Sequence, residues 1–229
     1  MITDIHTHHE PTEAGRQAIV SLSVGEEGWV PSDILEQHPH TLFSIGLHPW
    51  HVHAHWAELI DERMLPLISS HQVVAIGEAG LDRIRGGAWS LQVDAFVRQA
   101  QLAAQMGKPL IVHCVKAFDE LIRLHRELFS KEKWIIHGFR GKGEQAAQLL
   151  HHGFALSFGE HYHAEALLRC PMDCLFMETD ESGTPIQELY RRAALLFHIE
   201  PDELVERVQE NICKWFLSSP SLPISGRLA

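Results

Sequence analysis

Residues 73–114 read VVAIGEAGLDRIRGGAWSLQVDAFVRQAQLAAQMGKPLIVHC and contain two apolar runs separated by a segment of helical periodicity. The runs at 73–80 and 109–114 are predicted strands, because each is short, apolar and ends in a polar residue or glycine. The segment at 90–106 repeats large apolar residues at the spacing of one helix face and stops at Gly107. Strands that are apolar on both faces and joined by such a helix are typical of a parallel sheet covered by helices.

The same alternation extends over the rest of the chain. Six further apolar runs have the character of strands: MITDIHTH, AIVSLSV, TLFSIGLH, KWIIHGF, FALSFG and CLFMETD. Helical periodicity is found at 54–69, 117–129, 186–198 and 202–217. Eight such units predict an α/β fold, a TIM-like (βα)8 barrel that forms a single domain over residues 1–229. Only about eight residues, HEPTEAGR, separate the first two strands, fewer than a helical crossover needs. The barrel is therefore predicted to be irregular there, with its first helix reduced or missing.

The composition restricts the class of protein. With 45% hydrophobic residues in a chain of 229, the protein can bury a core of its own. Its 19 basic and 30 acidic residues give a formal charge of −11, which argues against a protein that coats nucleic acid but not against a local site. The N-terminus lacks the pattern of a signal peptide, and no apolar run reaches about 18 residues, so we expect a cytoplasmic protein with no membrane partner. The four cysteines are expected to be free thiols.

Histidines and acidic residues recur where the predicted strands end. In MITDIHTH, two histidines two residues apart lie on the same face of a strand and can reach one metal ion. The residues at the strand ends are His6, His8, His48, Glu78, His113, His137 and Asp180. The carboxyl ends of barrel strands converge on one mouth, where active sites of this fold lie. Because buried imidazoles and carboxylates need polar partners, this set predicts a divalent metal site.

The number of these side chains predicts two ions. They exceed what one tetrahedral ion accepts, whereas a bridging carboxylate can serve two centres. The expected division is a first ion on His6, His8 and Asp180, a second on His113 and His137, and Glu78 between them. Imidazole and carboxylate together suit zinc, manganese, magnesium or iron, and the residues do not choose among these metals.

Six motifs in this order, DIHTH, GLHPW, GEAGLD, VHC, HGFRG and ETD, resemble the TatD family of metal-dependent hydrolases. The resemblance covers nearly the whole chain, including NICKWF near its end. It implies a TIM-like barrel, a centre of one or two metal ions, and deoxyribonuclease or 3′–5′ exonuclease activity. The metal ligands of the family fall on His6, His8, Glu78, His113, His137 and Asp180. The chain is short for this family, and it has ESGTP and HGFRG where the family usually has a small residue before proline and HCFSG.

The expected reaction is hydrolysis of a phosphodiester by a metal-activated water, with DNA or a small phosphodiester as a weakly bound substrate and no obligate protein partner. Asp180 is expected to act as general base as well as ligand. Arg140 is predicted to clamp a phosphate or carboxylate with its guanidinium, or to be an exposed loop residue. His48 is expected to contact a substrate phosphate or to lie beside Glu78.

Several neighbouring residues have two interpretations each. Asp4 shares the strand face of His6 and either orients its ring or caps nearby backbone. Glu178 lies two residues before Asp180, so its side chain points to the same face of the strand. It either orients a metal ligand or has no role in the site. Trp50 either stacks on a base or covers the core. The three histidines of HVHAHW are expected to point in different directions, because they lead into a helix.

Two other functions remain open from the sequence. The same activated water attacks a carbonyl carbon, which would make the protein a hydrolase of an amide, ester or lactone. A metal-bound barrel that no longer catalyses a reaction and serves as an interaction module is the other alternative. A purely structural metal site closes its coordination sphere, whereas the predicted ligands leave positions open, which favours an enzyme.

Overall fold

Eight strands hydrogen-bond in chain order into one parallel sheet, and helices connect most of them. The computed structural model describes residues 1–9, 16–25 and 33–217. The strands are β1 (Ile2–Thr7), β2 (Arg16–Ser23), β3 (Leu42–Gly46), β4 (Val73–Asp82), β5 (Leu110–Val115), β6 (Trp134–Ile136), β7 (Ala155–Phe158) and β8 (Leu175–Met177). Each predicted apolar run coincides with one of these strands, so the (βα)8 architecture is confirmed.

The sheet curves into a nearly closed barrel. Its first and last strands approach each other at a bridge between Thr7 and Asp180. The Asp180 N–H donates to the His6 carbonyl at 2.9 Å, and the His8 N–H donates to the Asp180 carbonyl at 3.3 Å. The closure therefore lies at the carboxyl ends of the strands and holds three predicted site residues side by side.

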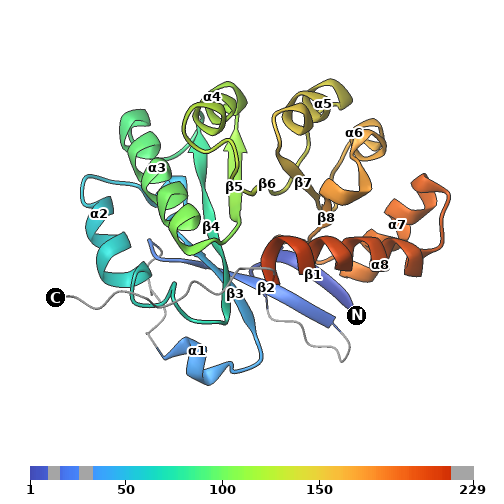
Figure 1. Ribbon diagram of the computed structural model, residues 1–229, viewed down its shortest axis with the longest axis horizontal. Coiled ribbons are helices and arrows are strands. Elements are labelled where there is room, and N and C mark those ends of the chain that lie inside the picture. The colour runs from blue at the N-terminus through green and yellow to red at the C-terminus, as the bar shows by residue number, and fades with distance from the viewer. Residues whose placement is uncertain (10–15, 26–32, 218–229) are drawn as a thin grey trace.

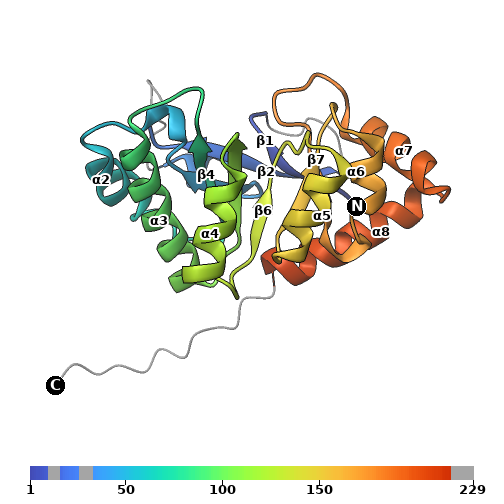
Figure 2. The same ribbon diagram turned by 90° about the horizontal axis from the view of Figure 1, so that it is seen from above.

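Helices cover the outside of the sheet in two groups. They are α1 (Ile34–Gln37), α2 (Trp56–Leu59), α3 (Trp89–Met106), α4 (Phe118–Leu128), α5 (Gly143–His151), α6 (Ala164–Arg169), α7 (Ile186–Phe197) and α8 (Pro201–Ile212). Figures 1 and 2 show α2 to α4 on one side of the molecule and α5 to α8 on the other, with strands between them. As predicted, α3 ends at Gly107, whose φ of 63° is left-handed. α8 begins at Pro201, with acidic residues in its first turn.

The first crossover is abnormally short. β1 and β2 pair in parallel with Ile2 opposite Arg16, so the chain returns along a whole strand within about eight residues. The described residues of this crossover, His8 and His9, are not helical. The expected loss of the first helix otherwise concerns residues 10–15, which lie outside the described residues. The helix after β2, α1, has only four residues. Over the first strands, the part of the chain that the structure describes therefore contributes little helical cover.

The helix predicted at 54–69 is shorter than expected. α2 passes into one wide turn over Ile60–Met64, in which the Leu65 N–H bonds to the carbonyl of Ile60, five residues back. Proline lacks the N–H that a helix needs, and its ring clashes with the preceding turn. Pro66 therefore ends the helix, and the prediction was wrong beyond this point because it did not take that proline into account.

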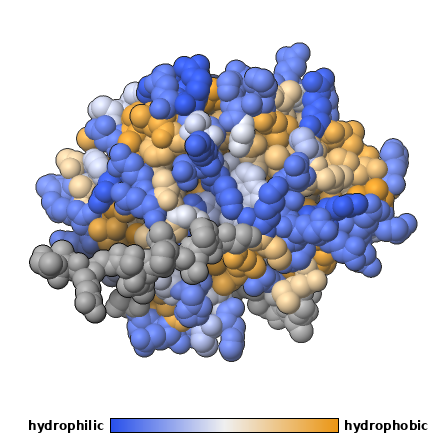
Figure 3. All heavy atoms as spheres, in the orientation of Figure 1, coloured by the Kyte–Doolittle hydropathy of each residue, from blue (hydrophilic) through white to orange (hydrophobic). Residues whose placement is uncertain are grey.

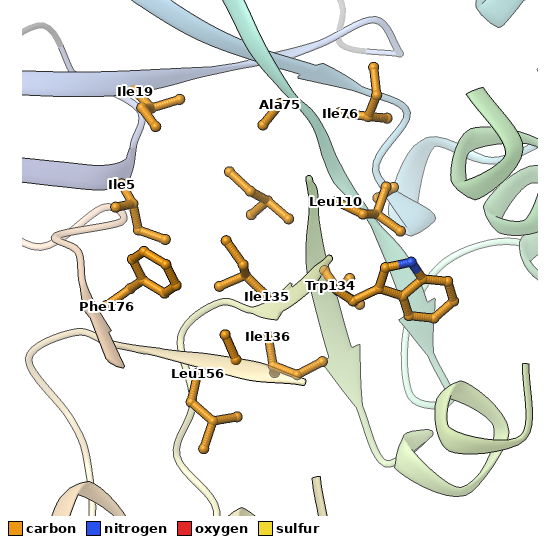
Figure 4. Packing of buried hydrophobic residues seen from close by; sticks show 14 of the residues in the cluster. Ile5, Ile19, Ala75, Ile76, Leu110, Trp134, Ile135, Ile136, Leu156 and Phe176 are labelled. Atoms are coloured by element: carbon orange, nitrogen blue, oxygen red, sulfur yellow. The ribbon is translucent and has the colours of Figure 1, made fainter. Parts of the chain in front are cut away.

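Apolar side chains fill the barrel and the layer between sheet and helices. Figure 4 shows Ile5, Ile135, Leu156 and Phe176 gathered around one volume, and each is fully buried. Burying each such side chain stabilises the fold by about 1.5–3 kcal/mol. On the outside, Figure 3 shows polar side chains interspersed with smaller apolar areas. Within the described ranges, no helix combines the length and the apolar character that crossing a membrane requires.

His125 of α4 places an imidazole inside an aromatic cluster. It is 2% exposed, its ring lies 4.7 Å from that of Phe154 and 5.0 Å from that of Trp134, and its Nε2 lies 3.1 Å from the Glu132 carbonyl oxygen. Burial lowers the pKa of His125 below the ordinary value of 6.5. As the pH falls through 6.5, the unfolded chain binds a proton that the native ring resists. The free energy of unfolding therefore falls with the pH.

A His125→Gln substitution is expected to reduce this sensitivity to acid, because glutamine can still donate to the Glu132 carbonyl but does not titrate. As the pH falls below 6.5, the free energy of unfolding of the variant should rise relative to that of the parent. The relative gain should be less than about 1.4 kcal/mol per pH unit. Urea unfolding between pH 5 and 8 measures it. The matched control is His151→Gln, on an exposed histidine of α5. Parallel pH curves for the parent and His125→Gln would contradict the prediction.

Candidate metal centre

The predicted site residues come together at the mouth of the barrel. β1, β3, β4, β5, β6 and β8, or the residues just after them, place His6, His8, His48, Glu78, His113, His137 and Asp180 around one cavity of about 150 Å³ or directly beneath it. His6 is fully buried, whereas the side chains of His8 and Asp180 are 27% and 29% exposed. The cluster is therefore closed below and open toward the mouth.

The carboxylate of Glu78 lies at the centre of the cluster, and its two oxygens face different histidines. Oε1 lies 2.7 Å from Nε2 of His137 and 2.8 Å from Nδ1 of His113. Oε2 lies 3.4 Å from Nε2 of His6 and 3.9 Å from Nε2 of His8. Glu78 thus stands between two groups of imidazoles, in the arrangement expected of a carboxylate shared by two metal ions.

Asp180 completes the group around the first strand. Its Oδ1 lies 3.8 Å from Nε2 of His6 and 3.6 Å from Nε2 of His8. The ligand atoms of these three residues lie within 4.8 Å of one another, as do those of His6, Glu78 and His137. The second group joins His137 to His6 and so crosses the predicted division, which stays a prediction together with the role of each residue as a ligand.

The electrostatics of the cluster favour a charged pair at its centre. Burial alone would raise the pKa of Glu78, but His137 and hydrogen bonds from the surrounding histidines outweigh it and hold the pKa well below its ordinary value. Burial also opposes charge on His137, yet Glu78 and Glu178 on either side raise the pKa of this imidazole. A metal that binds His137 must displace its proton, so metal binding and protonation compete here.

Unpaired ring nitrogens show that the cluster fits a metal. Both nitrogens of His6 and Nε2 of His113 are buried without a hydrogen-bond partner among the described residues. A buried polar atom without a hydrogen bond costs about 1–3 kcal/mol, and the carboxylate oxygens 3.4 Å from Nε2 of His6 and 3.5 Å from Nε2 of His113 do not form one. Imidazole nitrogen and carboxylate oxygen are ligands that divalent transition metals prefer. The donor set is thus of the right chemistry for the ions that the sequence predicts.

Glycines on either side of Glu78 allow its strand to pack closely against β5. A Cβ on Gly80 would collide with the carbonyl oxygen of His113, and one on Gly77 would lie 2.6 Å from that of Ile111. Gly77 also has a φ of 138°, which side chains rarely tolerate. The GEAG sequence therefore has a steric reason: it lets β4 and β5 bring Glu78 and His113 into contact.

Three polar residues that support the mouth were not predicted. Asp82 accepts a hydrogen bond from Nε1 of Trp50 at 2.7 Å and lies 3.5 Å from Nε2 of His113. Gln92 and Gln99, two turns apart on α3, are 2% and 1% exposed. Two signals in the sequence could have revealed them: Asp82 has the strand parity of Glu78, and the glutamines share one helix face.

The two glutamines hold the ends of β3 and β4. Oε1 of Gln99 accepts from the Leu47 N–H at 2.7 Å, and its Nε2 donates to the Leu47 carbonyl at 3.1 Å. Gln92 pairs in the same way with the backbone of Asp82, at 2.9 and 3.1 Å. Leu47 precedes His48, so these bonds help to place the side chains of the site.

Replacing Gln99 by leucine is expected to destabilise the protein by about 2 kcal/mol, because both backbone groups of Leu47 lose their partner inside the core. The same loss frees the backbone before His48 and should lower activity as well. Chemical denaturation measures the first effect. Gln101→Leu on the exposed face of the same helix is the control and should leave stability within about 0.5 kcal/mol. Equal effects of the two substitutions would contradict the role given to Gln99.

His48 contacts Glu78, as one of its two interpretations required. Its Nε2 lies 3.1 Å from Oε1 of Glu78, and its Nδ1 accepts from the Trp50 N–H at 3.2 Å. Burial lowers the pKa of His48, which favours the neutral ring. Because Nδ1 accepts, the proton of the neutral ring lies on Nε2 and is donated to Glu78. His48 therefore orients the carboxylate.

The acidic residues near the ligands have different roles. Asp4 is buried and accepts hydrogen bonds from the His6 N–H at 3.2 Å and from the hydroxyl of Thr179 at 2.6 Å. It therefore caps backbone, and no hydrogen bond joins it to the ring of His6, whose nitrogens are unpaired. Burial raises the pKa of Asp4 to about 7. Oε1 of Glu178 lies 3.3 Å from Nδ1 of His137, and this contact orients the ring.

The remaining predicted residues lie around the rim. Arg140 is exposed and lines a second cavity, of about 200 Å³, that also contains Asp180. Trp50 is 38% exposed and lines the central cavity, so it does not simply cover the core. The histidines of HVHAHW point in different directions only in part: His51 lines the central cavity, whereas His53 and His55 are exposed and their ring centroids lie 6.2 Å apart.

A (βα)8 barrel that gathers imidazoles and carboxylates at the carboxyl ends of its strands defines a class of protein, the metal-dependent hydrolases. The chain belongs to the TatD family, since the family model described as "TatD related DNase" matches residues 4–217. The resemblance of the six motifs is thereby confirmed.

Individual relatives agree with this assignment. An uncharacterized metal-dependent hydrolase of Haemophilus influenzae is 25% identical over 202 residues, 76% of this chain and 76% of that protein. The 3′-5′ ssDNA/RNA exonuclease TatD of Yersinia pseudotuberculosis is 26% identical over 189 residues, 76% of this chain and 72% of that protein. Its counterpart in Edwardsiella piscicida is 38% identical over 102 residues, 44% of this chain and 39% of that relative's length.

Solved structures share the fold. The structure of a TatD family hydrolase from Entamoeba histolytica superposes with a TM-score of 0.75 at 19% identity, covering 95% of this chain and 98% of that one. A TatD homologue from Escherichia coli gives a TM-score of 0.75 at 20% identity, with the same coverage. At this level of identity the likeness concerns the barrel alone.

Proposed function

We propose that this protein hydrolyses phosphodiester bonds of single-stranded nucleic acid at a centre of two divalent metal ions. The observation that carries the proposal is the position of Glu78, whose two oxygens face two separate groups of histidines. A carboxylate in this position can be shared by two ions, which two-metal phosphodiesterases hold about 3.5–4 Å apart. The names of the curated relatives, exonucleases acting on single-stranded DNA and RNA, support the choice of substrate.

In this proposal, different residues of the mouth would bind the two metal ions. His6, His8 and Asp180 would hold one ion, His113 and His137 the other, and Glu78 both. Ions bound there would supply Lewis acidity, which offsets the charge of a phosphodiester and lowers the pKa of water.

Two residues with access to the mouth would act on the substrate. Asp180 is the part-exposed carboxylate of the cluster and would accept the proton of the attacking water and pass it to the leaving oxygen. Arg140 lines the cavity that adjoins Asp180 and would bind a phosphate oxygen, because a guanidinium matches phosphate in bidentate fashion.

The experiment that tests the function begins with removal of metal by a chelator. The protein is then reloaded with zinc, manganese or magnesium, and elemental analysis determines the bound ions per chain. Each form is assayed with bis(p-nitrophenyl) phosphate, with a 5′-labelled single-stranded oligonucleotide, and with p-nitrophenyl acetate. We expect between one and two ions per chain and hydrolysis of both phosphodiesters.

The other outcomes are equally informative. Cleavage of the acetate without cleavage of either diester would replace the proposal by hydrolysis of a carbonyl substrate. Bound metal without activity on any of the three would favour an interaction module. Failure to take up metal would overturn the two-ion centre itself.

A further inference from the structure

A separate cavity of about 370 Å³ lies beside the metal centre. It is lined by the segment from Asp82 to Gly87, with Trp89 and Gln92. We call Arg83–Gly87 the arginine loop. Trp50 connects the two cavities, because it lines the central one while the guanidinium of Arg85 lies 3.6 Å from its ring centroid. An extended ligand that leaves the metal centre on this side therefore passes over Trp50 and Arg85.

The arginine loop is held in one conformation by buried polar groups. Oδ1 of Asp82 accepts hydrogen bonds from the N–H of Ile84 at 2.7 Å and of Arg85 at 2.9 Å. Nε2 of the buried Gln92 donates to the Gly87 carbonyl at 2.9 Å. The other carboxylate oxygen of Asp82 accepts from Trp50. One buried aspartate thus fixes both the loop and the indole, which preorganises the surface for a ligand.

The two sides of the mouth differ in charge. Arg83 and Arg85 stand on the side of the arginine loop, whereas Glu160 and Glu181 line the cavity on the opposite side with Arg140. Arg83 is paired with Asp119 at 3.3 Å, but among the described residues no carboxylate pairs with Arg85. Arg85 therefore makes this side of the mouth locally basic in a chain with a formal charge of −11.

Apolar and aromatic groups accompany these charges. Ile84 is 66% exposed and Trp50 is 38% exposed, although both are large and apolar. Aromatic rings with adjacent arginines are the elements that bind single strands without regard to sequence, because every base has a face that can stack. The combination fits a nucleotide better than a simple anion.

We propose that Trp50 and the arginine loop form the subsite for the nucleotide next to the scissile phosphodiester, and that the strand leaves the metal centre across this loop. The inference rests on the proposed function and adds the direction in which the substrate lies. The base contacts Trp50 beside the Arg85 guanidinium, which already covers one face of the indole. Arg85 binds the phosphate on the far side of that base, and Ile84 contacts the next sugar or base.

The test compares two substrates, a single-stranded oligonucleotide and bis(p-nitrophenyl) phosphate, which lacks a base and a strand. For Arg85→Ala and Trp50→Ala, we expect the ratio of kcat/KM on the oligonucleotide to that on the small diester to fall about tenfold or more. Trp50→Phe, which keeps a ring but loses the bond to Asp82, should recover most of the ratio. Arg98→Ala, on a partly exposed arginine of α3 that lies 3.8 Å from Asp61, is the matched control and should leave the ratio unchanged.

A second readout needs no activity. Fluorescence anisotropy with a labelled oligonucleotide in the presence of a chelator measures binding against salt concentration. Arg85→Ala should reduce the slope of log K against log salt by about 0.7, the value for one phosphate contact on a single strand. An oligonucleotide that lacks the base next to the scissile phosphate should bind the parent about tenfold more weakly, and Trp50→Ala should not weaken it further.

The outcomes separate this inference from the function on which it rests. If the parent cleaves neither diester, the proposed function fails and the subsite fails with it. If the parent cleaves both, but the ratio and the salt slope are unchanged in Arg85→Ala and Trp50→Ala, only the subsite is overturned. Cleavage of the small diester alone would keep a phosphodiesterase and remove the strand as occupant of the loop.

Discussion

Replacement of Glu78 by glutamine is expected to lower kcat/KM on a phosphodiester by more than about 100-fold and to remove at least one bound metal ion per chain. Altering a residue that merely orients a metal ligand costs about 10–100-fold, and Glu78 stands between both groups of predicted ligands. The amide keeps the shape of the side chain but loses its charge and one acceptor. Elemental analysis and bis(p-nitrophenyl) phosphate kinetics measure the two effects.

The control for this change is Glu188→Gln. Glu188 also accepts hydrogen bonds from cationic side chains, at 2.7–2.8 Å, but does so on the surface of α7, away from the mouth. It should keep both metal and activity. Circular dichroism should show that Glu78→Gln still folds, since the barrel core does not depend on this carboxylate. A folded Glu78→Gln protein with full metal content and activity would refute the assignment of the centre.

Asp180→Gly is expected to make the protein more stable and at the same time nearly inactive. Asp180 has a φ of 56°, a left-handed conformation that costs a residue with a side chain about 1 kcal/mol and costs glycine almost nothing. Its backbone bonds to β1 hold it there, and they survive the substitution. Removal of the carboxylate takes away the proposed base, a group that contributes about 10²–10⁴-fold to the rate.

His198→Gly provides the matched control. His198 also has a φ of 56°, but it is an exposed residue at the end of α7. Glycine there should stabilise the protein by a similar amount and leave activity unchanged. Thermal unfolding and phosphodiester kinetics on both variants decide the matter. If Asp180→Gly kept its activity, Asp180 would be neither base nor essential ligand, and its strained conformation would need another explanation.

Much of the fold was predictable because it depends on short-range patterns. A run of four to eight apolar residues that ends in a polar one is consistent with a buried strand, and all eight runs of this chain form strands. The helix predicted at 54–69 ends early for an equally local reason, since Pro66 stops it although the apolar periodicity continues. The predicted site residues were found because strand ends in a barrel share one mouth.

The residues that the sequence did not reveal make contacts between distant segments. Asp82 lies in GEAGLD, yet its role depends on Trp50 and on a loop that folds back over its carboxylate. Gln92 and Gln99 look like ordinary polar positions of an amphipathic helix until that helix is packed against the ends of β3 and β4. Their importance follows from burial, which a single sequence does not specify.

The sequence by itself determined the architecture, the family and the set of imidazoles and carboxylates at the mouth, because strand alternation and strand ends are local properties of the chain. Only the tertiary structure decided how these groups face one another. The two oxygens of Glu78 face different histidines because the curvature of the sheet turns the ends of β1, β5 and β6 toward the end of β4 across the mouth. Asp180 adopts its left-handed conformation because closure of the barrel ties it to His6, 174 positions earlier in the chain.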